Sequence, residues 1–118
     1  MSKEEALKRV TENGWDLYEL SDDLKKDIEI VTAAVNSEPG SIEYADESLR
    51  DNKELMTLAI IKSENGMIMK YASDNLKKDK QFVLDMLIKT KDNYVLSNAD
   101  ESLQEDAELQ AQAQKNLG

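Results

Sequence analysis

The chain has 118 residues, 40% of them hydrophobic and 34% charged, with only one proline and four glycines. This length favours a single domain, and the composition is too apolar for a disordered chain and poor in turn residues, so helices are expected. The absence of cysteine and histidine excludes disulfides, catalytic pairs built on Cys or His, and zinc sites of the usual N/S type. Fifteen basic against 25 acidic residues give a net charge of −10, which disfavours direct binding to nucleic acid and to anionic membranes.

The first residues lack the continuous apolar segment of a signal peptide, and no later run approaches the roughly 20 apolar residues that span a bilayer. We therefore expect a soluble, cytoplasmic protein without a membrane partner.

A segment of similar sequence recurs four times along the chain, at residues 20–27, 45–52, 72–79 and 99–106. Each copy contains one leucine at the same position, and a turn signal such as Asn-Gly or Pro-Gly precedes it. The four leucines are Leu24, Leu49, Leu76 and Leu103. The spacing predicts a tandem array of units of about 26 residues.

Taken in chain order, residues 1–13 are predicted to form an N-terminal capping helix. Three full repeats follow at 14–39, 40–65 and 66–92, and residues 93–118 form a C-terminal capping repeat. The predicted fold class is all-α, a short α-solenoid of tandem helix-turn-helix repeats, of either handedness.

The second half of each repeat is predicted to be a helix that begins after an Asp or Asn able to cap it. Counted from that cap, positions 3, 4, 7 and 8 are apolar and form one helical face. The caps are Asp27, Asn52, Asp79 and Asp106. In the last copy Gln110 and Gln114 occupy positions 4 and 8. This predicts a polar outer side, which is typical of the terminal repeat of an array.

The first half of each repeat is predicted to be a shorter helix, joined to the second by a single turn that holds the repeated leucine. Leu17 and Leu20 show the spacing in the first copy, and Ser21 follows them as a cap for the turn. Gly66 follows Asn65 at an expected helix end, so we expect it to adopt a positive φ.

These motifs resemble a known family. The segments YADESLRDN at 44–52 and YASDNLKKD at 71–79, between Gly turns and apolar helices, are similar to a tandem helical repeat family of bacteria and viruses catalogued as a domain of unknown function. The resemblance covers about residues 13–106. It implies a helical repeat fold and assigns no catalytic residue.

The repeated carboxylates are expected to cap helices rather than to bind a metal or take part in catalysis. Counted from Asp22, Leu24 and Lys26 stand where a calcium-binding EF-hand loop needs oxygen ligands, and no phosphate-binding glycine loop occurs. We therefore predict no catalytic residue, no cofactor, no metal and no enzymatic activity.

The strongest candidates for partner contact lie near the two ends of the array. Trp15 and Tyr18 belong to the residue types that most often dominate interfaces, whereas Tyr44 and Tyr71 are expected to pack between helices. The predicted partner-binding residues are Trp15, Asp16, Tyr18, Glu19, Asp100 and Glu101.

Only the third repeat is not acidic, because residues 67–92 carry six lysines and four acidic residues. The lysines are Lys70, Lys77, Lys78, Lys80, Lys89 and Lys91. They are interpreted either as solvated surface residues or as a dock for an acidic segment.

The function expected from the sequence is a non-enzymatic protein-protein interaction module that binds a basic protein through an acidic helical-repeat surface. One alternative is a phage-type acidic inhibitor, or nucleic-acid mimic, that blocks a host nucleic-acid-binding defence protein. A second alternative is an enzyme that works through carboxylates alone. The sequence leaves the partner and the oligomeric state open.

Overall fold

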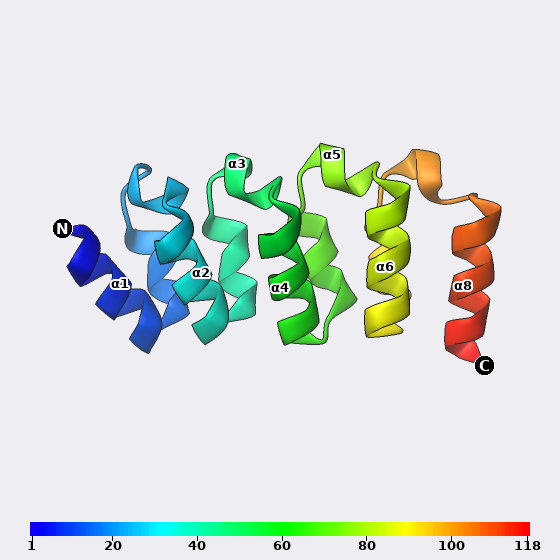
Figure 1. Cartoon of the computed structure of the whole chain (residues 1–118), viewed down its shortest axis with the longest axis horizontal. Helices are drawn as coiled ribbons and strands as arrows, with labels where there is room; N and C mark the ends of the chain where they lie inside the picture. The colour runs from blue at the N-terminus through cyan, green and yellow to red at the C-terminus, as the bar shows by residue number, and fades with distance from the viewer.

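Five long α-helices lie side by side along one axis and all run in the same direction (Figure 1). The computed structural model describes residues 1–118, contains no strand, and extends over 49 × 24 × 17 Å. No helix is both long enough and apolar enough to span a membrane. The long helices are α1 (Lys3–Glu12), α2 (Ile28–Ser37), α4 (Lys53–Ser63), α6 (Lys80–Thr90) and α8 (Ala107–Leu117).

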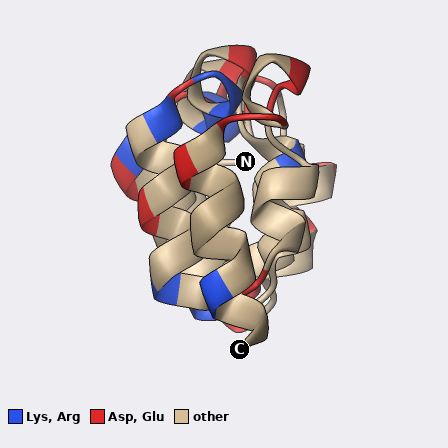
Figure 2. Ribbon diagram, turned by 90° about the vertical axis from the view of Figure 1, so that its right-hand side faces the viewer, with Lys and Arg blue, Asp and Glu red and all other residues tan.

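Short helices form a second layer, which lies beside the long helices in the end view of Figure 2. Three of them are 3₁₀-helices and the fourth is a single α-turn: η1 (Gly14–Glu19), η3 (Pro39–Tyr44), η4 (Gly66–Tyr71) and α7 (Tyr94–Ser97). One-turn helices join the two layers along one edge of the array, which we call the turn edge. These are η2 (Leu24–Lys26), α3 (Glu47–Arg50), α5 (Asp74–Lys77) and η5 (Glu101–Leu103). The α-solenoid of tandem repeats expected from the sequence is confirmed.

Each long helix after α1 begins directly after the residue that the sequence assigns as its cap. The Asp27 carboxylate accepts the N–H groups of Glu29 and Ile30, at 2.9 and 3.2 Å. The side-chain oxygen of Asn52 likewise accepts a hydrogen bond from the N–H of Leu55, at 2.9 Å. Each cap satisfies N–H groups that have no partner inside the helix, so the start of the helix is fixed by side-chain chemistry.

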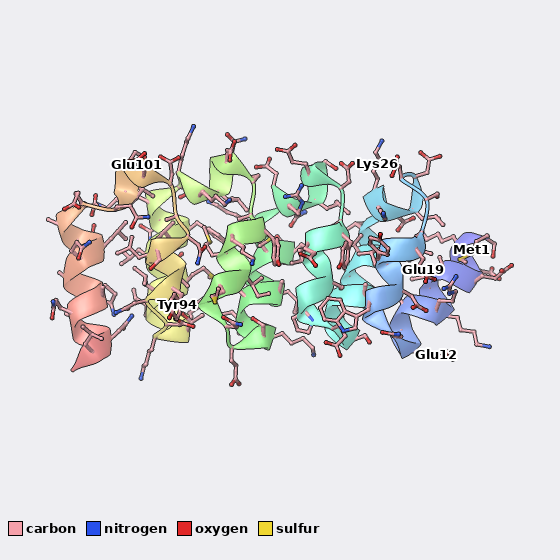
Figure 3. All side chains as sticks on the ribbon, turned by 180° about the vertical axis from the view of Figure 1, so that it is seen from behind. Met1, Glu12, Glu19, Lys26, Tyr94 and Glu101 are labelled. Carbon is pink, nitrogen blue, oxygen red and sulfur yellow. The ribbon has the colours of Figure 1, made fainter.

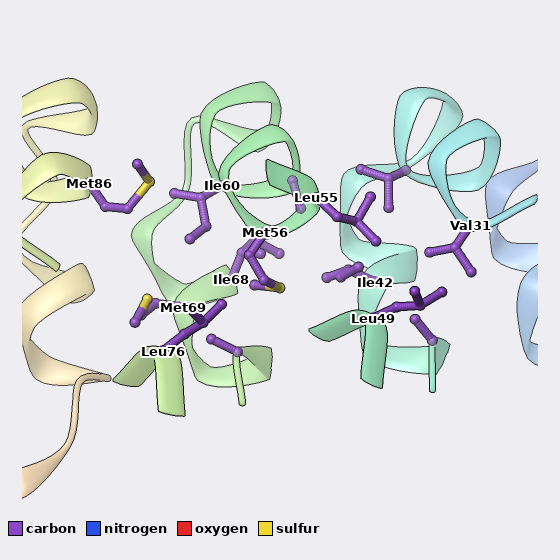
Figure 4. Close-up of a cluster of buried hydrophobic side chains, with 14 of the residues drawn as sticks. Val31, Ile42, Leu49, Leu55, Met56, Ile60, Ile68, Met69, Leu76 and Met86 are labelled. Carbon is purple, nitrogen blue, oxygen red and sulfur yellow. The ribbon is translucent and has the colours of Figure 1, made fainter. Parts of the chain in front are cut away.

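The core lies between the two layers and forms one cluster from Ala6 to Leu109. Figure 4 shows its central part. The predicted inner faces of α2, α4 and α6 are all buried. The repeated leucines insert from the turn edge: Leu49 and Leu76 are buried, whereas Leu24 and Leu103, nearer the ends, are partly buried. In α8 only Leu109 is fully buried, and Gln110 and Gln114 are exposed.

The first half of three repeats is a 3₁₀-helix, although the sequence predicted only a short helix of unspecified type. The buried residues of η1 and its C-cap explain the difference: Gly14, Leu17 and Leu20 follow one another at intervals of three residues. A 3₁₀-helix has 3.0 residues per turn, so this spacing places all three on one line facing the core.

Backbone hydrogen bonds join each one-turn segment to the next along the turn edge. The N–H of Asp46 donates to the carbonyl of Lys25 at 3.1 Å, and that of Ser73 donates to Arg50 at 3.0 Å. Asp100 donates to Lys77 at 2.9 Å. At the last repeat the equivalent carbonyl, that of Gln104, instead accepts the side-chain amide of Gln110.

Gly66 does not have the positive φ expected for it. The left-handed residues are Glu64 and Lys91, with φ of 54° and 57° at the ends of α4 and α6. Gly66 is buried against the next repeat, where a Cβ would lie 2.8 Å from the backbone nitrogen of Val95. Its N–H donates to the Asp92 carboxylate at 2.8 Å. Close approach between repeats, rather than backbone conformation, therefore requires glycine here.

We predict that Gly66→Ala lowers the free energy of unfolding by about 1–3 kcal/mol, because the added methyl group must push Val95 or Asp92 away. Gly118→Ala is the matched control, since a Cβ there meets no atom closer than 3.8 Å. Denaturant unfolding of both variants measures the difference. If Gly66→Ala and Gly118→Ala unfold with the same free energy, the contact of Gly66 with Val95 and Asp92 leaves room for a methyl group.

Acid should weaken the array through the capping aspartates. The pKa of Asp79 lies below its ordinary value because of the ammonium of Lys53, at 2.8 Å, and the N–H of Phe82. The pKa of Asp106 is lowered by the N–H of Leu109 and by Lys80. A carboxylate whose pKa is depressed by folding stabilises the fold above its unfolded pKa of about 4, and this contribution is lost as the pH falls through the folded pKa.

We therefore predict that the free energy of unfolding decreases as the pH falls below about 4. Asp79→Asn should reduce this slope, because asparagine still caps a helix, as Asn52 does, but does not titrate. Urea unfolding at several pH values measures the slope. A variant with the parental slope would contradict a role for the Asp79 charge.

Candidate partner-binding surface

Three aromatic side chains meet on the outer side of the short-helix layer, and we call them the aromatic cluster: Trp15, Tyr18 and Tyr44. Tyr18 and Tyr44 contact edge to face with ring centroids 5.0 Å apart, and Trp15 approaches Tyr44 in the same way at 6.4 Å. Trp15 is 46% exposed and Tyr18 64% exposed. The cluster is thus held by its own ring contacts while it presents two aromatic side chains to solvent.

Gly40 makes room for the indole of Trp15. A Cβ on Gly40 would lie 2.7 Å from the tip of the indole ring, so the ring occupies the space that a side chain would fill. The position of Gly40 in its repeat corresponds to that of Trp15 in the first copy and to Met67 and Tyr94 in the later ones. Only the second repeat has glycine at this position, and this departure from the other repeats is the feature of the sequence that could have indicated the contact with Trp15.

The two acidic residues predicted beside the cluster are held by one arginine. The guanidinium of Arg9, on α1, lies 2.7 Å from Glu19 and 3.4 Å from Asp16. Sequence reasoning missed Arg9, because it lies in the capping helix, outside the repeated segment. This pairing reduces the negative charge beside Trp15 and Tyr18.

Asp100 and Glu101 lie on the turn edge of the last repeat, and the structure does not bring them near the aromatic cluster. Figure 3 labels Glu19 and Glu101 toward opposite ends of the array. Asp100 caps η5, since its carboxylate accepts the N–H of Ser102 at 2.9 Å. Hydrogen bonds from the Ser102 side chain and backbone lower the pKa of Asp100. The side chain of Glu101 is exposed and makes no hydrogen bond or ion pair.

Glu43 lies between two partly buried tyrosines of neighbouring repeats. The neighbouring carboxylate of Glu43 raises the pKa of Tyr44, and burial and then Glu43 raise the pKa of Tyr71. Both hydroxyls therefore remain protonated near neutral pH. Both rings pack against the core as the sequence predicted, and Tyr44 in addition supports the aromatic cluster.

The six lysines of the third repeat do not form one patch. Lys77, Lys78 and Lys80 lie at the turn edge, whereas Lys89 and Lys91 lie at the opposite end of α6, about 15 Å away for a helix of this length. Lys70 sits over the ring of Tyr71, at 5.1 Å. Lys80 is paired with Asp106 and Glu108, both at 3.1 Å. These lysines are close in sequence, but the length of α6 separates them into two groups.

No group of three or more acidic side chains is placed to hold a metal ion. The most polar hollow lies on the turn edge between the second and third repeats, and it contains no lysine or arginine. It is lined by Asp46, Glu47, Ser48, Asp51, Ser73, Asp74 and Asn75. Asp46 is occupied as a helix cap, and Asp51 accepts a hydrogen bond from the hydroxyl of Ser73.

One family of sequences matches the chain twice in tandem, over residues 2–50 and 52–104. Its description is "Domain of unknown function (DUF4116)". The chain belongs to this family. Each match is about two repeat lengths long and the boundary between them falls inside the second repeat; the two matches together cover nearly the whole array. No curated protein and no solved structure matches the chain significantly.

We predict that Gly40→Ala displaces the indole of Trp15 and makes it more exposed, because the new methyl group takes its space. Trp15 is the single tryptophan of the chain, so a red shift of its fluorescence reports the displacement directly. Gly118→Ala serves again as the control. An unchanged emission spectrum in a folded Gly40→Ala protein would contradict the described contact.

Proposed function

We propose that this DUF4116 protein is a non-enzymatic protein-protein interaction module that binds a basic protein partner. The observation that carries the proposal is the aromatic cluster, in which Trp15 and Tyr18 are exposed yet fixed by Tyr44. Tryptophan and tyrosine often provide most of the binding energy of an interface, and fixed rings lose little freedom on binding.

The charge of the chain supports a basic partner. At a net charge of −10, long-range attraction speeds encounter with a positively charged protein and repels nucleic acid. The turn edge of the last repeat carries four acidic residues and no basic residue of its own: Asp100, Glu101, Glu105 and Asp106. The nearby positive charges are Lys80, which is paired with Asp106, and Lys78, which acts on Asp100. This edge offers a second contact for a partner that extends along the array. We also propose a cytoplasmic location, on the sequence features described above.

A selection from random displayed peptides tests the proposal while the partner is unidentified. Selected peptides should be richer in lysine and arginine than in acidic residues, and Trp15→Ala with Tyr18→Ala should abolish their binding. Met67→Ala with Tyr94→Ala is the matched control, because both residues are exposed at the position equivalent to Trp15 in later repeats. Selected peptides that are acidic, or that bind both variants equally, would refute the proposal.

We predict that the association rate of a selected peptide falls as salt rises, because charges are screened over about 8–10 Å at physiological ionic strength. Asp16→Asn with Glu19→Gln should be compared with Asp100→Asn with Glu101→Gln, by stopped-flow fluorescence of Trp15. Loss of affinity in both pairs, together with competition by duplex DNA for a DNA-binding protein, would favour the nucleic-acid mimic instead. Association rates that change neither with salt nor with any of the four substitutions would rule out both the binding of a basic partner and the nucleic-acid mimic.

A further inference from the structure

Ion pairs join the starts of neighbouring long helices. In α1, α4 and α6 the first helical residue is a lysine, and it contacts the capping aspartate of the next long helix. The distances are 3.1 Å for Lys3–Asp27, 2.8 Å for Lys53–Asp79 and 3.1 Å for Lys80–Asp106. These three pairs form a regular series that we call the lysine–aspartate ladder.

The ladder is interrupted between α2 and α4, where both partners differ together. Ile28 stands in place of the lysine, and Asn52 stands in place of the aspartate. Asn52 still caps α4, so the helix start is kept and only the ion pair is lost. As a result, Ile28 is 44% exposed at a position where α1, α4 and α6 present a lysine.

Ile28 separates two hollows on the outer side of the long-helix layer. One lies between α1 and α2 and includes Leu7 and Ala33; the other lies between α2 and α4 and includes Leu58. Ile28 and Thr32 line both hollows. The three helices lie side by side in Figure 1, so the two hollows are adjacent grooves of one surface.

The charged residues that line these hollows are Glu29 and Glu54, and neither lining contains a lysine or arginine. Glu29 is paired with Lys3 at 3.2 Å, whereas Glu54 makes no ion pair. An apolar surface with one unpaired carboxylate and no basic residue in its lining, on a chain of net charge −10, matches a ligand with apolar side chains on one face and basic side chains beside them. A second copy of this chain is disfavoured, because each copy carries the same unpaired Glu54 and a net charge of −10.

We propose that the surface around Ile28 docks a basic amphipathic helix of a partner protein. Packed helices lie about 8–10 Å apart, so neighbouring grooves have about the same spacing. Side chains seven residues apart on one face of a helix are separated by about 10 Å, so two leucines at this interval can enter both grooves together. This inference rests on the proposed function and adds a second binding surface, on the layer opposite the aromatic cluster.

The probe is a helical peptide of lysine and alanine with two leucines seven residues apart. A peptide of the same composition with the leucines five residues apart is the comparison, since it places them on opposite faces. Titration followed by methyl NMR should shift the signals of Ile28 and Leu58, and the first peptide should bind at least about tenfold more tightly, as expected for burial of one further large apolar side chain.

The decisive variant is Ile28→Lys with Asn52→Asp, which completes the ladder at constant net charge and should melt no lower than the parent. It should weaken binding of the probe about tenfold or more. The matched control is Ile88→Lys with Gln114→Glu, which removes an isoleucine of 48% exposure on α6 and also keeps the net charge. The control should bind like the parent.

Binding of the probe without a shift of the Ile28 methyl signals, or equal binding to the ladder variant, would overturn this inference and leave the proposed function standing. The same holds if the two peptides bind equally. Failure of the proposed function is seen separately, when the peptides selected on the parent are acidic or bind Trp15→Ala with Tyr18→Ala as well as they bind the control variant. A probe that binds nowhere on the chain would also overturn the docking surface.

Discussion

The capping side chain at the start of each long helix is the interaction on which the rest of the structure depends. Asp79 accepts the N–H of Phe82 and, in the same position, contacts Lys53 of the preceding repeat. One carboxylate thereby fixes where a helix begins and also where its neighbour lies. Backbone hydrogen bonds between one-turn helices, such as that from the N–H of Ser73 to the carbonyl of Arg50, fix the relative position of the same neighbouring repeats.

Much of the fold can be predicted from the sequence because a repeat presents the same physical problem several times. The caps and the inner helical faces recur at fixed spacing, so each copy supports the assignment of the others. The 3₁₀ geometry is harder to predict, since Leu17 and Leu20 are three residues apart in either kind of helix. Only the additional burial of Gly14, three residues earlier, distinguishes the two geometries.

The candidate site is less predictable, because its contacts join different repeats. Gly40 matters through the indole of Trp15, and Gly66 through Val95; neither contact can be inferred from local sequence. Arg9 similarly binds Asp16 and Glu19 from a different helix. In a tandem array the useful signal is a copy that departs from the others. By that criterion, Gly40, Ile28 and Asn52 are the positions that the sequence alone could single out.

The direction of the long helices explains where the negative charge lies. All five helices point their N-termini toward the turn edge, and the partial positive charge there favours acidic side chains. Part of the acidity of the protein is therefore structural, as Asp100 shows by capping η5. The Glu101 side chain makes no such contact, so its charge has no role in holding the turn. Because asparagine can cap as aspartate does, Asp100→Asn keeps the turn intact, and a loss of binding in that variant reports charge rather than unfolding.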